Sequence, residues 1–287
     1  MTVGRPAARE AHKDNQAARH ASEGLRAMRK YPFTLPAVVL LTAVVYAASL
    51  PQTGLAQQPV VVELFTSEGC SSCPPADSML ITLSHKRDTN IAKLILLEEH
   101  VEYWNQGGWI DRFSGPTYTE RQADYVKDLH LETSYTPQIV IDGHLQASGN
   151  NPAAVQEFIL QAAKNPKPVM VALHPVASNK LEVSVDGPAD KKLQVLFAVT
   201  EDDLTSNVRG GENGGKTLTH SAVVRELHRL GSMSDGKFAK TVDLPDKSGW
   251  KKENLRAIVL VQNSNSGEIL GAADVAYVPA SVQTVGK

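Results

Sequence analysis

Hydrophobic runs and amphipathic stretches alternate along residues 59–164. The β-branched runs 59–65 and 91–97 are typical of buried strands, and residues 71–86 between them place apolar side chains on one helical face. The same patterns predict a polar helix at 117–129, a hairpin of strands at 138–141 and 145–147, and a helix at 152–164. This order of strands and helices predicts an α/β fold in which helices cover a central sheet.

The pattern changes at 165–168, where the sequence Asn-Pro-Lys-Pro interrupts it. Beyond this point apolar residues recur with a period of two, and turn residues separate the runs. The predicted strands are 169–173, 181–185, 193–199, 222–227, 255–261 and 269–275. Many short strands with almost no helical pattern predict an all-β, sandwich-like domain at 167–287, which follows the α/β domain at 57–166.

Residues 1–56 form an N-terminal extension with the pattern of a signal peptide. A basic pair precedes a short apolar run at 36–50, and small residues lead to Ala56. The run is shorter than the about 20 residues that span a membrane, so we expect cleavage after Ala56 and export to the periplasm or the medium. An uncleaved anchor is the alternative, and it is then the chain's contact with a membrane. Because Met28 directly precedes the basic pair, we expect translation to start there.

The composition is that of an ordinary globular protein. Of 287 residues, 42% are hydrophobic and 21% are charged, which excludes a disordered chain, a collagen-like chain and a membrane protein with several spans. The formal net charge is −2, so no basic surplus predicts nucleic-acid binding. The cysteines are Cys70 and Cys73, and two cysteines exclude both a multi-disulfide scaffold and a four-cysteine zinc site.

The cysteine pair lies between a predicted buried strand and a predicted helix. Free backbone N–H groups and the dipole at a helix start favour a thiolate, so we expect Cys70 to be exposed, acidic and the attacking sulfur. Cys73 lies one turn later on the same face, where it can close a disulfide. A structural disulfide over so short a loop constrains the unfolded chain very little. The pattern therefore favours redox chemistry, with metal binding and an inert pair as alternatives.

A strand, a Cys-x-x-Cys motif, a helix and a distant Thr136-Pro137 before a strand together resemble the thioredoxin fold. The resemblance implies that the Thr136–Pro137 peptide bond is cis and packs against the cysteine pair, with Pro137 as a site residue. It also implies a buried acid that accepts a proton from the second cysteine. Glu63, the only charge in the strand 59–65, is the candidate for that role.

Longer motifs resemble one exported, thioredoxin-like bacterial family, domain of unknown function 1223. The segment 62–77, which carries both cysteines, is similar to the opening of that family. Other segments that fit its pattern are 100–104, 108–109, 113–121, 135–138, 209–213, 218–220 and 223–225. The resemblance covers nearly all of 59–278. It implies family and fold, and no activity, because the family has none assigned.

Several polar and aromatic residues near the predicted strand ends are further candidates. His100 follows a buried strand, and with Cys70 and Cys73 it would suit Cu(I) or Zn(II), although such a histidine is more often structural. Glu98 and Glu99 are expected to form a solvated strand end. Tyr103, Trp104 and Trp109 are expected either to form a substrate rim or to pack a long loop onto the domain.

A glycine-rich loop at 210–215 is the remaining motif. It lacks the Lys-Ser/Thr ending and the following helix of a phosphate-binding P-loop, so we interpret it as a mobile hairpin loop.

These observations predict an exported thiol–disulfide oxidoreductase that acts on protein thiols or disulfides or on a redox partner protein. Cys70 attacks, a mixed disulfide forms, and Cys73 resolves it. This chemistry needs no cofactor. Two other functions stay open: a periplasmic copper-handling module that uses both thiolates and His100, and a non-enzymatic interaction protein in which the C-terminal β domain acts.

Overall fold

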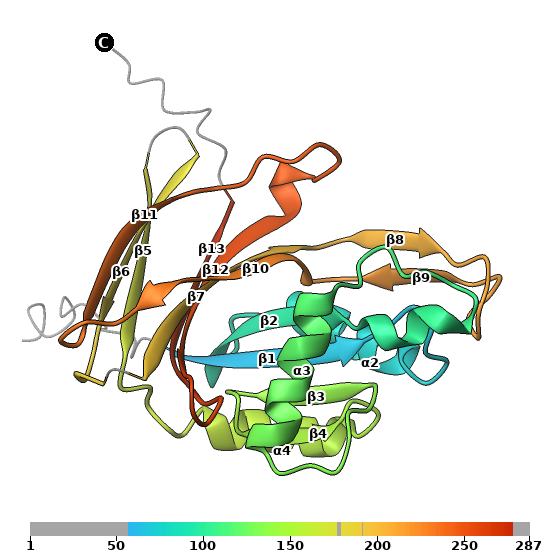
Figure 1. The fold of residues 1–287 in the computed structure, drawn as a ribbon, viewed down its shortest axis with the longest axis horizontal. Coiled ribbons are helices and arrows are strands. Elements are labelled where there is room, and N and C mark those ends of the chain that lie inside the picture. Colours follow the sequence, from blue (N-terminus) through green and yellow to red (C-terminus); the bar gives the residue numbers. More distant parts are fainter. Residues whose placement is uncertain (1–56, 177–178, 191, 278–287) are drawn as a thin grey trace, which may run out of the picture. The chain divides into compact units, whose positions relative to one another are not determined.

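The computed structural model describes residues 57–176, 179–190 and 192–277, and Figure 1 shows their arrangement. The predicted signal peptide and its cleavage site lie outside the described residues. Within those ranges, no helix is long and apolar enough to cross a membrane.

A mixed eight-stranded sheet is the largest element, and its strand order is β13-β12-β7-β10-β2-β1-β3-β4 (Figure 1). Its strands are β1 (Gln58–Thr66), β2 (Ala92–His100), β3 (Gln138–Ile141), β4 (Leu145–Ser148), β7 (Leu193–Glu201), β10 (Val223–Ser232), β12 (Leu255–Asn263) and β13 (Ile269–Ala276). β2 runs parallel to both of its neighbours, β1 and β10. The other neighbouring strands are antiparallel.

Smaller sheets and helices surround this sheet. A three-stranded sheet contains β5 (Met170–Val176), β6 (Lys180–Asp186) and β11 (Lys237–Asp243), and a two-stranded sheet contains β8 (Leu204–Asn207) and β9 (Thr217–His220). The helices are α2 (Pro74–Ser84), α3 (Pro116–Asp128) and α4 (Pro152–Ala162), with 3-10 turns at Glu102–Gly107 and Lys252–Asn254.

The large sheet overturns the predicted fold class. Strand β10, from the C-terminal half, pairs with β2, so that Val223 lies opposite Glu98 and the Glu98 N–H donates to the Ala222 carbonyl at 2.8 Å. The prediction of an α/β thioredoxin-like domain joined to a separate all-β sandwich is wrong. The described structure is mostly β, and one mixed sheet runs through both halves. Apolar periodicity reports which face of a strand is buried, and not which strand lies beside it. The boundary at 166–167 falls between α4 and β5 and stays a prediction.

Strand β1 is buried on both faces. Val62 and Leu64 pack with Leu80 of α2 on one face. Val61 belongs to the cluster on the other face, which includes Tyr118 of α3. Successive side chains of a strand point to opposite faces, so the position of a residue in β1 decides which helix it meets.

The parallel strands β1 and β2 end together, which positions the candidate site. Thr66, the last residue of β1, lies opposite His100, the last residue of β2. The chain leaves β1 through the cysteine loop into α2, and it leaves β2 through the loop 101–115. Helix α2 also contacts β9. Two loops that are distant in sequence therefore leave the sheet at the same edge, and β9 lies against the helix that follows one of them.

Candidate functional site

Cys70 and Cys73 form a disulfide at the start of α2. Cys73 is the N-cap residue, and the helix begins at Pro74 rather than at the predicted position 71. Both cysteine side chains are completely buried, whereas Ser71 and Ser72 between them are exposed. The prediction that Cys70 is exposed is thus wrong for the disulfide form. Its Sγ nevertheless lies 3.4 Å from Oγ of the exposed Ser72.

The loop between β8 and β9 covers the cysteine motif from the C-terminal half. The side-chain amide of Asn213, which is completely buried, donates to the carbonyl oxygens of Glu68 and Cys70, both at 2.9 Å. The Ser71 N–H donates to Glu212 Oε2 at 3.0 Å. These contacts explain why Cys70 is buried. They also give a role to a loop that sequence reasoning interpreted as a mobile hairpin.

We expect Asn213→Ala to speed reduction of the disulfide by dithiothreitol on the order of tenfold. The change leaves two buried carbonyl oxygens without their donor, at a cost of about 1–3 kcal/mol, and so favours an open loop. Thiol release at fixed pH measures the rate. Asn207→Ala, at an exposed asparagine of the same hairpin, is the matched control. A rate equal to that of the wild type would mean that the loop does not limit access.

The Thr136–Pro137 peptide bond is cis, as the resemblance to the thioredoxin fold implies. The Pro137 carbonyl accepts the Gly149 N–H at 2.9 Å. A Cβ on Gly149 would lie 2.8 Å from Cβ of Ala76 in α2 and 3.0 Å from Cβ of Pro137, so this segment lies against the first turn of α2. The next residue, Asn150, donates its side-chain amide to the Ser72 carbonyl at 3.0 Å. The proline segment is therefore tied to the cysteine loop.

The aromatic residues after β2 hold this edge of the sheet together. Trp104 Nε1 donates to Thr136 Oγ1 at 2.8 Å, and Trp109 Nε1 donates to Glu68 Oε2 at 2.7 Å. The Tyr103 hydroxyl donates to Gln122 Oε1 at 3.1 Å. Of the two alternatives from the sequence, these contacts favour packing of the loop over a substrate rim.

Glu63 lies on the α3 face of the sheet, because its neighbours Val62 and Leu64 face α2. Arg121 Nε donates to Glu63 Oε2 at 2.6 Å, and the Tyr125 hydroxyl donates to Glu63 Oε1 at 2.6 Å. The structure therefore brings Glu63 together with α3 and not with the cysteines. Its role in proton transfer stays a prediction.

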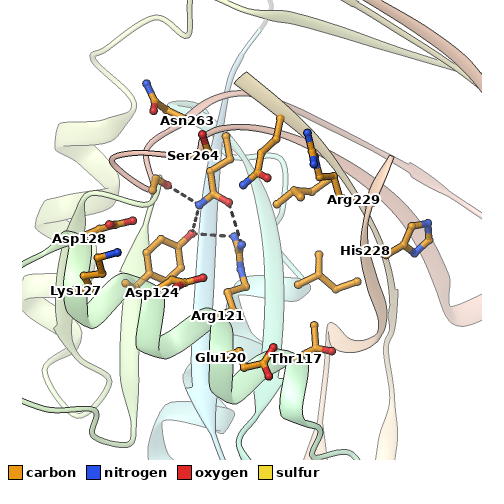
Figure 2. A pocket seen from close by; sticks show the side chains of 16 residues that line it. Thr117, Glu120, Arg121, Asp124, Lys127, Asp128, His228, Arg229, Asn263 and Ser264 are labelled. Carbon is orange, nitrogen blue, oxygen red and sulfur yellow. Dashed lines mark hydrogen bonds between the residues drawn. The ribbon is translucent and has the colours of Figure 1, made fainter. Parts of the chain in front are cut away.

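The cluster around Arg121 forms one wall of a pocket of about 320 Å³ (Figure 2). Arg121 also donates to Gln262 Oε1 at 3.1 Å, and both residues line the pocket. Charged side chains such as Glu120, Asp124 and Lys127 line it as well. Neither cysteine is among the lining residues, so this pocket is separate from the disulfide.

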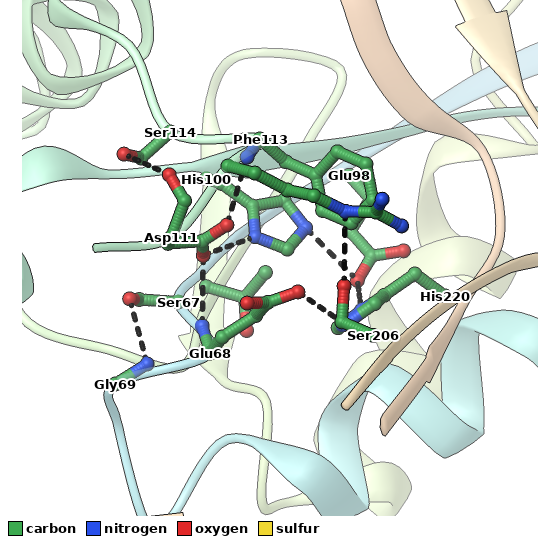
Figure 3. Close-up of polar contacts among 12 residues, drawn as sticks. Ser67, Glu68, Gly69, Glu98, His100, Asp111, Phe113, Ser114, Ser206 and His220 are labelled. Carbon is green, nitrogen blue, oxygen red and sulfur yellow. Dashed lines mark hydrogen bonds and ion pairs between the residues drawn. The ribbon is translucent and has the colours of Figure 1, made fainter. Parts of the chain in front are cut away.

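A second polar cluster lies at the ends of β2 and β9 (Figure 3). His100 Nδ1 lies 2.6 Å from Asp111 Oδ2, and His220 Nδ1 lies 2.7 Å from Glu98 Oε1. The two imidazole rings lie 4.9 Å apart. Burial lowers the pKa of His100, but the Asp111 carboxylate outweighs burial and holds the pKa well above its usual value. Glu98 is completely buried, so the predicted solvated strand end is wrong.

The predicted copper ligands are not joined in the structure. His100 contacts Asp111 and the ring of Phe113, whose centroid is 5.3 Å from its own. Among the described residues, no hydrogen bond links His100 to either cysteine sulfur, and both sulfurs are engaged in the disulfide. A copper site of Cys70, Cys73 and His100 stays a prediction.

Asp77, which sequence reasoning missed, is a buried carboxyl in the first turn of α2, on the opposite face of the sheet from Glu63. The Thr66 hydroxyl donates to Asp77 Oδ1 at 2.7 Å, and the Asp77 N–H donates to the Cys73 carbonyl at 3.2 Å. Burial and the nearby Glu98 carboxylate raise the pKa of Asp77 to about 7. An aspartate in the first turn of a helix is usually a surface residue that favours the dipole, so its sequence position gave no signal.

The chain is similar in fold to solved structures such as the following one. A crystal structure of an Agrobacterium tumefaciens protein is 27% identical, with a TM-score of 0.62, over 78% of this chain and 96% of that chain. A domain of the outer membrane lipoprotein Omp28 from Porphyromonas gingivalis is 18% identical over 40% of this chain and 99% of that chain, with a TM-score of 0.24. A TM-score this low does not establish a shared fold.

The family comparison covers most of the chain. A family model described as "Protein of unknown function (DUF1223)" matches residues 61–262. No match was found among curated proteins. The matched range includes the cysteine loop, the cis-proline segment and the loop between β8 and β9.

Proposed function

Because this chain belongs to the DUF1223 family, whose function is unknown, we propose its function from the site alone: thiol–disulfide exchange through Cys70 and Cys73. The disulfide carries the proposal, because its cysteines are separated by three positions. In the chain-entropy model a loop this short contributes roughly 2 kcal/mol of stability, against about 4.7 kcal/mol for a loop of 100 residues. Reactivity therefore accounts for the pair better than stabilisation does.

The surroundings of the pair support exchange with a protein partner. Side chains from two distant loops, Asn213 and Asn150, fix the backbone on either side of the exposed Ser71 and Ser72. A fixed loop holds the S–S bond in one orientation for in-line attack. The exposed serines beside Cys70 give a partner a place to approach.

In the oxidised protein, a partner thiolate attacks Cys70 Sγ, the Cys70–Cys73 bond breaks, and Cys73 leaves as a thiolate that takes up a proton. A second partner thiolate then displaces Cys70. The partner gains a disulfide, and the protein gains two electrons and two protons as a dithiol. The reverse sequence oxidises the protein and reduces the partner.

For the proton on Cys73 we favour Asp77 as the exchanging group. Both residues are buried, and Asp77 lies one turn further along α2, since its N–H donates to the Cys73 carbonyl. Residues at this spacing share a helix face. Glu63 is the alternative from the sequence, but it lies on the opposite face of β1.

Export is part of the proposal. The basic pair and the apolar run at 36–50 have the pattern of a signal peptide, and disulfides persist in oxidising compartments such as the periplasm. The partners are then exported protein thiols or disulfides.

The test is covalent trapping in whole cells. We expect Cys73→Ser to accumulate mixed disulfides with partner proteins on a non-reducing gel, because attack by Cys70 continues while resolution is lost. Cys70→Ser should give far fewer adducts, since Cys73 is the helix N-cap, whereas Cys70 Sγ lies beside the hydroxyl of the exposed Ser72. The double variant Cys70→Ser/Cys73→Ser is the blank. Equal adducts from the two single variants would contradict the assigned roles, and adducts from neither would contradict the exchange function.

A further inference from the structure

A cluster of metal-ligating side chains that the exchange reaction does not use lies beside the residues that precede Cys70 (Figure 3). It contains the imidazoles of His100 and His220 and the carboxylates of Glu98 and Glu68. All four side chains are completely buried. The cluster joins the end of β2, the end of β9 and the loop that precedes Cys70.

Both histidines are oriented by a carboxylate on the same ring nitrogen. Asp111 Oδ2 lies 2.6 Å from Nδ1 of His100, and Glu98 Oε1 lies 2.7 Å from Nδ1 of His220. An imidazole that donates from Nδ1 presents its Nε2 lone pair to a cation once the cation displaces the Nε2 proton. This carboxylate–histidine arrangement is the one that fixes histidine ligands at zinc sites. Asp111 itself is held by the backbone N–H groups of Glu68 and Phe113, at 2.8 and 2.9 Å.

The atoms that this arrangement leaves free lack partners. Among the described residues, Nε2 of His100, Nε2 of His220 and Oε1 of Glu68 are buried and accept or donate no hydrogen bond. Buried polar atoms are almost always paired, so three such atoms in one cluster require an explanation.

The spacing of these atoms suits a shared cation. His220 Nε2 lies 3.7 Å from Glu68 Oε1, which exceeds the 2.7–3.2 Å of ordinary hydrogen bonds. Ligands at about 2.0–2.1 Å from one tetrahedral zinc ion are about 3.3 Å apart. The ring centroids of His100 and His220 lie 4.9 Å apart, and one nitrogen of each ring lies within 4.8 Å of the other and of a Glu98 oxygen.

We propose that the unpartnered atoms, Nε2 of His100, Nε2 of His220 and Oε1 of Glu68, bind one divalent transition cation of the Zn²⁺ class. Asp111 and Glu98 orient His100 and His220 from outside the ligand set. The cation fastens the end of β9 and the loop before Cys70 to the end of β2. This site uses neither cysteine, so it differs from a copper site built on the thiols, and it does not depend on the exchange reaction.

Because the ligands are completely buried, the cation is expected to enter while the chain folds. The experiment therefore unfolds the full chain in the presence of a chelator and refolds it with or without Zn²⁺. After gel filtration, the metal content is measured by mass spectrometry. We expect one Zn²⁺ per chain in the wild type and in Cys70→Ser/Cys73→Ser. A wild type without stoichiometric metal, or a cysteine variant that loses it, would overturn the proposal.

Substitutions identify the ligands. His100→Gln and His220→Gln should each lose stoichiometric Zn²⁺, while His228→Gln, at a half-exposed histidine of β10, should keep it. Asp111→Asn should keep the ligands and weaken binding about 10–100-fold, as outer carboxylates do. Retention of full affinity in both ligand variants would contradict the assignment.

If a ligand variant does not fold, the absorption spectrum of the wild type with Co²⁺ provides the test instead. The protein refolded with Co²⁺ should show visible bands of nitrogen and oxygen ligands without thiolate-to-cobalt charge transfer. A thiolate band would place the metal on the cysteines instead. Absence of any bound Co²⁺ would indicate that the histidines are protonated partners of their carboxylates.

Discussion

Arg121→Met is expected to lower the free energy of unfolding by about 3–5 kcal/mol, because it removes the cation from a buried charge cluster. Arg121 Nε lies 2.6 Å from Glu63 Oε2 and 3.4 Å from Glu99 Oε1, and both carboxyls are completely buried. Burial raises the pKa of Glu99 well above its usual value, although Arg121 opposes this shift. Without the guanidinium, the buried Glu63 carboxylate loses its cation and keeps the Tyr125 hydroxyl as a donor.

Urea unfolding followed by circular dichroism measures this loss. Lys127→Met is the matched control, since Lys127 is an exposed cation of the same helix, and it should change stability by less than about 0.5 kcal/mol. Adding Glu63→Gln to Arg121→Met should recover part of the loss, because the unpaired charge is then removed as well. A loss below about 1 kcal/mol for Arg121→Met would show that water reaches the cluster.

The positions of the strands could be predicted from the sequence because they depend on local patterns. The run at 59–65 is β1 (Gln58–Thr66), and the run at 193–199 is β7 (Leu193–Glu201). Both strands are buried along most of their length, and β-branched or apolar residues fill them. The cis bond before Pro137 is confirmed too, although it was predicted from the family resemblance rather than from local physics.

The neighbours of these strands could not be predicted in the same way. The run at 222–227 does form part of β10, but nothing in its alternation says that it pairs with β2. The same missing information explains the error at the end of β2. Glu98 and Glu99 looked like a solvated end, and the structure buries both completely. Glu98 accepts from the His220 side chain and the Ser221 N–H, both from the C-terminal half.

Only the local part of the candidate site could be predicted, because long-range contacts leave no pattern in the sequence. The Cys70–Cys73 pair has a short spacing and can be read directly from the chain. Asn213 and His220 act through contacts that span more than a hundred residues, and single buried polar residues leave no periodic signal. Their motifs fitted the family pattern, but a family of unknown function attaches no role to them.

The wild type is expected to lose stability as the pH rises from about 4 to 7, and Asp77→Asn is expected to abolish this loss. Burial and Glu98 raise the pKa of Asp77 from 3.8 to about 7 in the folded protein. Within this window, the folded state keeps a proton that the unfolded chain has released. Stability is therefore highest below the unfolded pKa, and it falls by about 1.4 kcal/mol per pH unit until the folded pKa is reached. The total is about 4 kcal/mol, and asparagine, which does not titrate, contributes none of it.

Denaturant unfolding at about pH 4.5, 6 and 7.5 measures this dependence, with a chelator present so that no cation shifts the groups around Asp77. His100, His220 and Glu98 act on the carboxyl in the folded state, but they are present in both proteins. The difference between the two pH profiles therefore isolates Asp77 to first order. The variant keeps an oxygen that accepts the Thr66 hydroxyl hydrogen bond, so the two proteins should have similar stability at about pH 4.5. At higher pH, Asp77→Asn should be the more stable protein. Asp124→Asn, at an exposed carboxylate of α3, should leave the wild-type profile unchanged. Parallel profiles for Asp77→Asn and the wild type would mean that this carboxyl is already ionised across the whole range.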